Sequence, residues 1–321
     1  FWFGGKTSCD LRAEIVAPDY VRGSFDSVCH LQTYDVLDTL NLMIAIRKLA
    51  RLASVAFGLA IVLVVSACSP EVKPAQDYSV QPQVIAVVGD FGSGRAAEGR
   101  VSKMVAAMNP SIVVTAGDNT YNKKGYAKMV KRYYPQQLIP ATGNHDYLIG
   151  IGKFDQFFNI DSKARSYVYS AASGADFFIL DSTAGLSSKR VRAEQKEWLT
   201  RKLAESDANF KIVVLHHPPF SSSKHGSTKA YKWAYSDLGA DLVISGHDHT
   251  YERIQRWSGL YIVDGTGGAK LYKCKPKRVY GSQLCDDKHY GALFLYINEY
   301  QLRGVFRNTA GQALDTFDIV K

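Results

Sequence analysis

Five apolar runs of this chain end in side chains that can bind metal ions or move protons. The endings are Gly-Asp at 89–90, Gly-Asp at 117–118, Gly-Asn-His-Asp at 143–146, His-His-Pro at 216–218 and Gly-His-Asp-His at 246–249. In α/β proteins, functional side chains gather at the carboxyl ends of strands. Carboxylate, imidazole and phenol side chains that lie close together can bind a metal ion through their oxygen and nitrogen atoms. The pattern therefore indicates a metal centre.

Each of these features has a simpler interpretation when it stands alone. A Gly-Asp pair after a strand is usually a turn in which the aspartate bonds to nearby backbone N–H groups. A lone histidine is more often structural than a ligand. Of the eight histidines, however, six lie in or near the five endings. This repetition favours a joint metal site over unrelated turns.

The elements that must position these residues alternate from about residue 84. Short apolar runs predict buried strands within 84–90, 111–118, 138–146, 175–182, 211–219 and 240–249. Helical spacing predicts helices at 96–108, 193–206 and 227–238. The stretch 290–306 predicts a hairpin that turns near Asn298 and Glu299. No internal repeat is evident, so we expect one α/β domain with a mixed sheet.

Composition and charge set broad limits on the class of protein. The 321 residues are 46% hydrophobic and 21% charged, which is typical of a globular protein and excludes a disordered tail. The formal charge of +9 favours an anionic partner such as phosphate, nucleic acid or a membrane surface. Charge alone does not choose among them.

The N-terminal part of the chain has the pattern of an export signal. Residues 1–42 precede this pattern and do not share it, and we interpret them as translated upstream sequence rather than a domain. Arg47, Lys48 and Arg51 precede a mostly apolar stretch at 52–67. That stretch is shorter than the roughly 20 residues that span a bilayer, so residues 43–67 predict a signal peptide.

The signal ends Val65-Ser66-Ala67-Cys68, which resembles the lipobox of bacterial lipoproteins. This resemblance implies a lipidated Cys68, membrane attachment, and an exported protein at the periplasmic or outer face of a membrane. A buried cysteine at the end of a membrane helix is the alternative. Residues 68–82 predict a Pro-rich tether, and residues 83–321 form the remaining domain.

Two later cysteines, Cys274 and Cys285, flank a basic loop. An exported chain meets oxidising conditions, so we expect a disulfide that closes this loop. A zinc site is the alternative, but the Cys-x-x-Cys spacing of such a site is missing.

The five endings, taken in order, resemble the calcineurin-like metallophosphoesterases. Order, spacing and residue types agree from about residue 84 to 270. Tyr121, three residues after Asp118, resembles the iron-binding phenolate of the purple acid phosphatases within that family; the alternative is a partly exposed loop tyrosine. The resemblance implies a four-layer α-β-β-α sandwich of two mixed sheets. It also implies that Gly265, Gly267 and Gly268 lie on a close-packed loop near the site.

The resemblance also implies the ligands of two metal ions. Asp90, Tyr121 and His249 would bind Fe(III), and a divalent Fe, Zn or Mn ion would be bound by Asn144, His216 and His247. Asp118 would bridge the two ions. His217 is the alternative to His216, but the family's His-x-Pro spacing favours His216.

The implied activity is hydrolysis of phosphate monoesters, on a small molecule or a phosphoprotein, by in-line attack of metal-bound hydroxide. His145 would contact the phosphate and act as general acid, and Asp146 would orient His145. His225 resembles a second substrate-binding histidine, although a surface-loop histidine is the alternative.

Two other functions stay open at this point. The first is a metal-dependent phosphodiesterase or nucleotide hydrolase of the same fold, suggested by the lysines and tyrosines that alternate over 121–134. The same stretch also fits a helix whose tyrosines pack inward, so we expect no specific nucleic-acid partner. The second is a metal-holding surface protein without efficient catalysis.

Overall fold

The computed structural model describes residues 81–123, 125–133, 136–161 and 165–321. The signal peptide, Cys68 and most of the tether that the sequence predicts lie outside these described residues. Within them, no helix combines the length and the apolar character that a membrane span requires.

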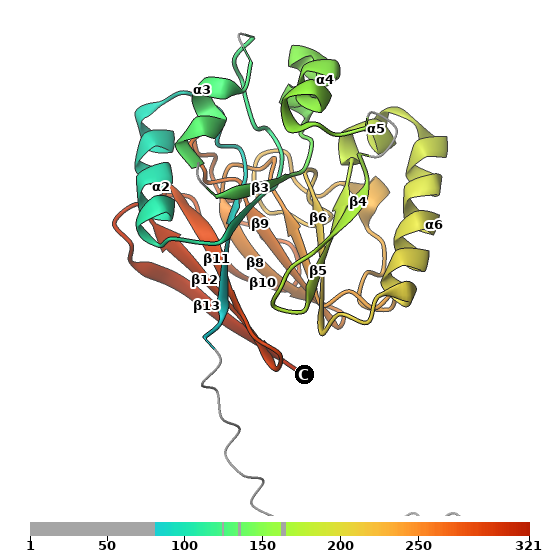
Figure 1. Cartoon of the computed structure of the whole chain (residues 1–321). Helices are drawn as coiled ribbons and strands as arrows, with labels where there is room; N and C mark the ends of the chain where they lie inside the picture. Colours follow the sequence, from blue (N-terminus) through green and yellow to red (C-terminus); the bar gives the residue numbers. More distant parts are fainter. Residues whose placement is uncertain (1–80, 124, 134–135, 162–164) are drawn as a thin grey trace, which may run out of the picture. The chain divides into compact units, whose positions relative to one another are not determined.

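The described residues include thirteen strands, which form two mixed sheets (Figure 1). The six-stranded sheet has the order β13-β12-β11-β1-β2-β3 and consists of β1 (Gln83–Val88), β2 (Ile112–Thr115), β3 (Gln137–Pro140), β11 (Gly291–Ile297), β12 (Gln301–Asn308) and β13 (Ala313–Val320). The seven-stranded sheet has the order β10-β8-β9-β7-β6-β5-β4 and consists of β4 (Tyr167–Ser170), β5 (Ala175–Leu180), β6 (Phe210–Leu215), β7 (Leu242–Ser245), β8 (Tyr251–Arg256), β9 (Gly259–Asp264) and β10 (Ser282–Asp286).

The helices are α2 (Ala96–Ala107), α3 (Ala127–Val130), α4 (Asn144–Phe158), α5 (Ser182–Ser187) and α6 (Lys189–Glu205), with 3₁₀ turns at Lys131–Tyr133 and Lys229–Tyr231. Valines of α2 pack on the outer face of β1 and β2, while leucines of α6 pack on the outer face of the other sheet. The inner faces of the two sheets share one core, in which Val87 of β1 and Val214 of β6 belong to the same buried cluster. The expected four layers are therefore confirmed, with two sheets where strand spacing alone predicted one (Figure 1).

Strand register brings the functional endings together. The parallel pairs β1–β2 and β2–β3 place Val88 opposite Thr115, and Thr115 opposite Pro140. In the other sheet, the parallel pair β6–β7 places Leu215 opposite Ser245. Within each sheet, the carboxyl ends of these strands thus lie at matched heights, and the polar residues follow within four positions.

The prediction of a helix at 227–238 is wrong. Only the turn Lys229–Tyr231 is helical there. Tyr231, Trp233 and Tyr235 are buried while Lys232 between them is exposed, so alternate residues face the core. This spacing of two is that of extended chain, because a helix buries every third or fourth residue.

Two other local predictions are confirmed. Strands β11 and β12 pair antiparallel, and their connection includes Asn298 and Glu299. Cys274 and Cys285 form a disulfide. The predicted strand at 138–146 is shorter than expected, because β3 ends at Pro140 and α4 begins at Asn144.

Candidate metal centre

Three of the predicted ligands have a left-handed backbone conformation. The φ angles of Asp90, Asp118 and His247 are 55°, 52° and 68°. A residue with a Cβ atom pays roughly 1–2 kcal/mol for this conformation, which therefore needs support from its surroundings. At each of these positions the turn sends the side chain out of the strand direction and into the centre.

The glycines before the ligands are required by close packing. A Cβ added at Gly117 would lie 2.5 Å from the Nδ1 of His216, and one added at Gly143 would lie 2.1 Å from the Oδ1 of Asp118. At Gly246 the same atom would lie 2.6 Å from the Oδ2 of Asp90. Each glycine thus leaves room for a ligand that comes from another strand.

The first group of donor atoms consists of Asp90, Tyr121 and His249. The Tyr121 hydroxyl lies 3.1 Å from the Asp90 Oδ1 and 3.2 Å from the His249 Nε2. The His249 Nε2 lies 3.3 Å from the same Asp90 oxygen. The three atoms form a compact triangle, which we call the first triad.

The second group consists of Asn144, His216 and His247, and we call it the second triad. The Asn144 Oδ1 lies 3.0 Å from the His216 Nε2 and 2.9 Å from the His247 Nδ1. The two histidine nitrogens are 3.3 Å apart. The structure thus brings together the residues of each ligand set that the family resemblance implies.

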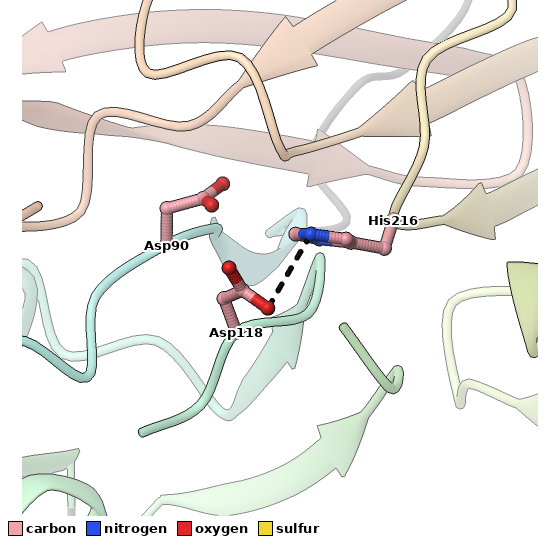
Figure 2. A group of neighbouring side chains, drawn as sticks. All are labelled: Asp90, Asp118 and His216. Atoms are coloured by element: carbon pink, nitrogen blue, oxygen red, sulfur yellow. Dashed lines mark ion pairs between the residues drawn. The ribbon is translucent and has the colours of Figure 1, made fainter. Parts of the chain in front are cut away.

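Asp118 lies between the triads. Its Oδ1 is 3.4 Å from the His216 Nε2 of the second triad, and its carboxylate is close enough to Tyr121 in the first triad to raise the pKa of that phenol. Figure 2 shows the carboxylates of Asp90 and Asp118 facing the His216 ring, and one ligand atom from each of the three lies within 4.8 Å of the others. A carboxylate that bridges two ions must lie between their two sets of donor atoms, and Asp118 has this position.

The chemistry of these donor sets fits metal ions. His216 Nδ1 lies 2.8 Å from the Ala116 carbonyl oxygen, and His249 Nδ1 lies 2.8 Å from that of Lys270. A carbonyl only accepts, so both Nδ1 atoms carry the proton and each neutral ring turns a lone pair of Nε2 inward. In the second triad, the Asn144 oxygen and the His216 lone pair face each other at 3.0 Å. A cation between them satisfies both.

Electrostatics within the metal-free centre also favour added positive charge. Burial raises the pKa of Asp118 to about 6. The attraction of His216 opposes this shift and is larger than the further raising contribution of Asp90, so burial dominates. Burial lowers the pKa of His216, but Asp118 and Asp90 raise it above its ordinary value overall. Burial together with these two carboxylates raises the pKa of Tyr121 well above its usual range. A phenolate here therefore needs a strongly charged cation beside it.

His145 lies at the rim of the first triad. Its backbone N–H donates to the Asp118 Oδ1 at 2.8 Å, and its ring lies 4.3 Å from the Tyr121 ring, measured between centres. Burial lowers the pKa of the half-buried imidazole. The position is suited to a group that contacts the substrate.

Asp146 has a different position from the one expected. Its buried carboxylate accepts hydrogen bonds from the Gly143 N–H at 2.7 Å and from the Asn119 Nδ2 at 3.0 Å. Among the described contacts none joins it to the His145 ring. Asp146 thus fixes the loop after β2 to the start of α4, and burial raises its pKa to about 7.

The rings of the two remaining predicted histidines, His217 and His225, both contact the ring of His247. His217 Nδ1 lies 2.9 Å from the Ser182 hydroxyl, whereas the Nε2 of His216 lies 3.0 Å from the Asn144 Oδ1 in the second triad. His225 is exposed, and its ring packs 4.4 Å from that of His247. The structure thus brings His225 to the edge of the centre.

Sequence reasoning missed three residues that shape the site. The Tyr272 ring stacks on His249 at 4.1 Å, Asn119 joins two ligand loops, and the Asp248 carboxylate is fully buried. Asn119 and Asp248 lie within the motifs, next to predicted ligands, and this position could have identified them as residues of the site. Tyr272 follows the glycine loop at 265–268 and had none.

The glycine loop itself packs as expected. A Cβ at Gly265 would lie 2.9 Å from the Asp90 Oδ2, and one at Gly267 would lie 2.4 Å from the Gly89 carbonyl oxygen.

Comparison with known proteins agrees with this geometry. Purple acid phosphatase 15 of Arabidopsis thaliana is 26% identical over 251 residues, which are 61% of this chain and 47% of that protein. The tartrate-resistant acid phosphatase type 5 of Rattus norvegicus is 24% identical over 208 residues, or 52% of this chain and 64% of that protein. The match thus spans about half to two thirds of these relatives.

A solved structure supports the fold. The purple acid phosphatase PPD1 from yellow lupin (Lupinus luteus) seeds superposes with a TM-score of 0.61 at 20% identity, covering 74% of this chain and 53% of that one. The family model of the calcineurin-like phosphoesterases matches residues 84–251, the span that contains both triads. This chain belongs to the calcineurin-like phosphoesterase family and resembles its purple acid phosphatases.

Proposed function

We propose that this protein is a dinuclear-metal phosphatase that hydrolyses phosphate monoesters. The observation that carries the proposal is the pair of triads joined by Asp118. A bound metal pair would hold the phosphoryl group, lower the pKa of water and neutralise developing charge. Tyr121 supports Fe(III) in the first triad, because a phenolate is a hard, anionic oxygen, and the imidazoles of the second triad suit divalent iron, zinc or manganese.

The chain's own residues supply the remaining functions. In hydrolysis, water loses a proton as its oxygen forms a bond to phosphorus, the bond from phosphorus to the ester oxygen breaks, and the departing alkoxide takes up a proton. We propose that His145, whose ring lies beside that of Tyr121, donates this proton. Asp118 holds the His145 backbone N–H, so the bridging carboxylate and the acid keep a fixed spacing. We propose that His225 contacts the phosphate group of the substrate or the organic group esterified to it.

The diesterase or nucleotide alternative loses its main support. It relied on exposed tyrosines between the lysines of 121–134, but Tyr126 and Tyr133 are only 2% and 1% exposed. These rings belong to the core beneath α2.

The test is activity of metal-loaded protein on p-nitrophenyl phosphate and on bis(p-nitrophenyl) phosphate. We expect clear preference for the monoester and release of inorganic phosphate. A large preference for the bis-ester would instead identify a diesterase, and absence of turnover by fully loaded protein would favour the non-catalytic alternative.

Attachment to a membrane through a lipidated Cys68 stays a separate proposal, motivated by the sequence at 65–68. Cys68→Ser is expected to release the protein from membranes, and membrane association that persists in this variant would count against lipidation.

A further inference from the structure

The loop that carries His225, residues 221–226, is fixed from below by a buried carboxylate. The Asp248 oxygens accept hydrogen bonds from the backbone N–H groups of His225 and Gly226 at 2.8 and 2.9 Å, and from the Ser221 hydroxyl. Asp248 stands between two members of the triads, His247 and His249. The loop is therefore held in a defined position relative to the metal centre.

Residues 272–275 form a second segment that contacts this loop and the metal centre. The Lys275 N–H donates to the Ser222 carbonyl at 2.8 Å, and the Tyr272 N–H donates to that of His249 at 2.9 Å. The disulfide between Cys274 and Cys285 ties this segment to β10. Loop 221–226 is thus restrained both by Asp248 and by Lys275.

Two ammonium groups flank His225 on this scaffold. The Lys224 Nζ lies 4.5 Å from the centre of the Tyr272 ring, a favourable cation–π distance. Because His249 covers one face of that ring, Lys224 approaches the other face, away from the triad. The Lys275 Nζ lies beside Gly226, 3.3 Å from where a Cβ would be.

The charge of these lysines is not neutralised by the protein. Lys273 pairs with Asp287 at 3.5 Å, whereas neither Lys224 nor Lys275 has a carboxylate partner in the part of the chain that the structure describes. Two buried acids contact this loop, and both are occupied: Asp248 by the three donors named above, and Glu252 by the backbone N–H and hydroxyl of Ser222. Uncompensated positive charge beside a site attracts ligands of opposite charge.

We propose that Lys224, His225 and Lys275 form a second anion site next to the metal centre, and that the preferred substrate carries a second phosphate besides the one that is hydrolysed. This inference rests on the proposed phosphatase function. The His225 ring packs on His247, so one end of the site adjoins the second triad while the lysines lie farther out. A substrate with two phosphates fits both positions at once.

The test compares two substrates that differ by one phosphate, fructose 6-phosphate and fructose 1,6-bisphosphate. Wild-type protein is expected to have the lower KM for the bisphosphate. In Lys224→Met and Lys275→Met, the KM for the bisphosphate should rise about tenfold relative to that for the monophosphate. Added salt should raise the wild-type KM for the bisphosphate and have a weaker effect on the variants.

Lys196→Met provides the matched control, because Lys196 is an exposed lysine on α6. It should leave the ratio of the two KM values as in the wild type. If wild-type protein hydrolyses both sugars with equal KM, or if the lysine variants leave the ratio unchanged, the second anion site is refuted while the phosphatase function stands. If loaded wild-type protein hydrolyses neither sugar nor p-nitrophenyl phosphate, the proposed function itself fails.

Discussion

The Tyr121 hydroxyl lies 3.1 Å from the Asp90 Oδ1, although these residues follow different strands. Strand β1 precedes Asp90 and strand β2 precedes Tyr121, and parallel register brings the two strand ends together. Such a carboxylate–phenol contact provides two hard oxygens for one ion.

Tyr121→Phe should therefore remove the visible absorption of iron-loaded protein, because the variant lacks the phenolate that would colour ferric iron. Iron content in the ferric state should fall, while the divalent ion of the second triad is retained. Metal analysis and a visible spectrum measure both effects. Tyr235→Phe, a change at a fully buried tyrosine outside the centre, is the control and should keep the colour. Wild-type protein that is fully loaded with iron and colourless would contradict the assignment of Tyr121.

Gly143→Ala should weaken metal binding by about 10- to 100-fold, a typical cost of disturbing the surroundings of a ligand. Its added Cβ would lie 2.1 Å from the Asp118 Oδ1, and Gly143 has a negative φ, so the effect is steric. Titration calorimetry with Zn²⁺ measures it. Gly152→Ala on α4 is the control, because its Cβ would meet no atom within 4 Å. Equal affinities for the two variants would argue against close packing as the role of Gly143.

His145→Ala should lower kcat on p-nitrophenyl phosphate by about 10²- to 10⁴-fold, the usual contribution of a general acid. Metal content should stay at the wild-type level, because the His145 side chain belongs to neither triad. The loss should be smaller for ester substrates whose leaving group is more acidic, since these need less protonation. A kcat close to that of wild type would remove His145 from the acid role.

Asp264 gives a prediction for stability as a function of pH. It is fully buried at the end of β9, accepts hydrogen bonds from Thr266 and from the Leu293 N–H, and burial raises its pKa from 3.8 to about 7. A folded state that binds the proton more tightly than the unfolded state loses stability as pH rises between these two values. The contribution of this one group to the slope is at most about 1.4 kcal/mol per pH unit.

Asp264→Asn should remove this slope, even though the amide also changes the hydrogen bonds by an amount that does not depend on pH. Urea unfolding of metal-free protein from pH 4 to 7 measures the free energy of unfolding. The difference between variant and wild type should shift in favour of the variant as pH rises. A difference that stays constant over this range would show that Asp264 ionises normally.

Much of the centre could be predicted from sequence because its signals are local. Gly-Asp and Gly-His turns after apolar runs indicated where strands end, and the structure gives them the left-handed turns and tight glycines described above. Motif spacing favoured His216 over His217 as a ligand, and the structure places the His216 Nε2 3.0 Å from the Asn144 Oδ1.

Other features depend on tertiary contacts that no local pattern reports. Division of the strands into two sheets follows from pairings such as β1 with β11, which are about 200 residues apart. Tyr272 acquires its role only by stacking on His249. The helix predicted at 227–238 failed because the outer face of the seven-stranded sheet buries alternate aromatic residues there, and burial overrides helical propensity.

Each triad draws on both sheets: Asp90 and Tyr121 follow strands of one sheet and His249 follows a strand of the other, while Asn144 from the first sheet meets His216 and His247 from the second. Neither sheet alone can assemble either triad. During synthesis, the first triad is therefore complete only after the ribosome has added His249, so an ion cannot meet all three of its donor residues before then. Ions bound at such a centre would therefore link the two sheets to each other, and their removal would weaken the packing of one sheet on the other.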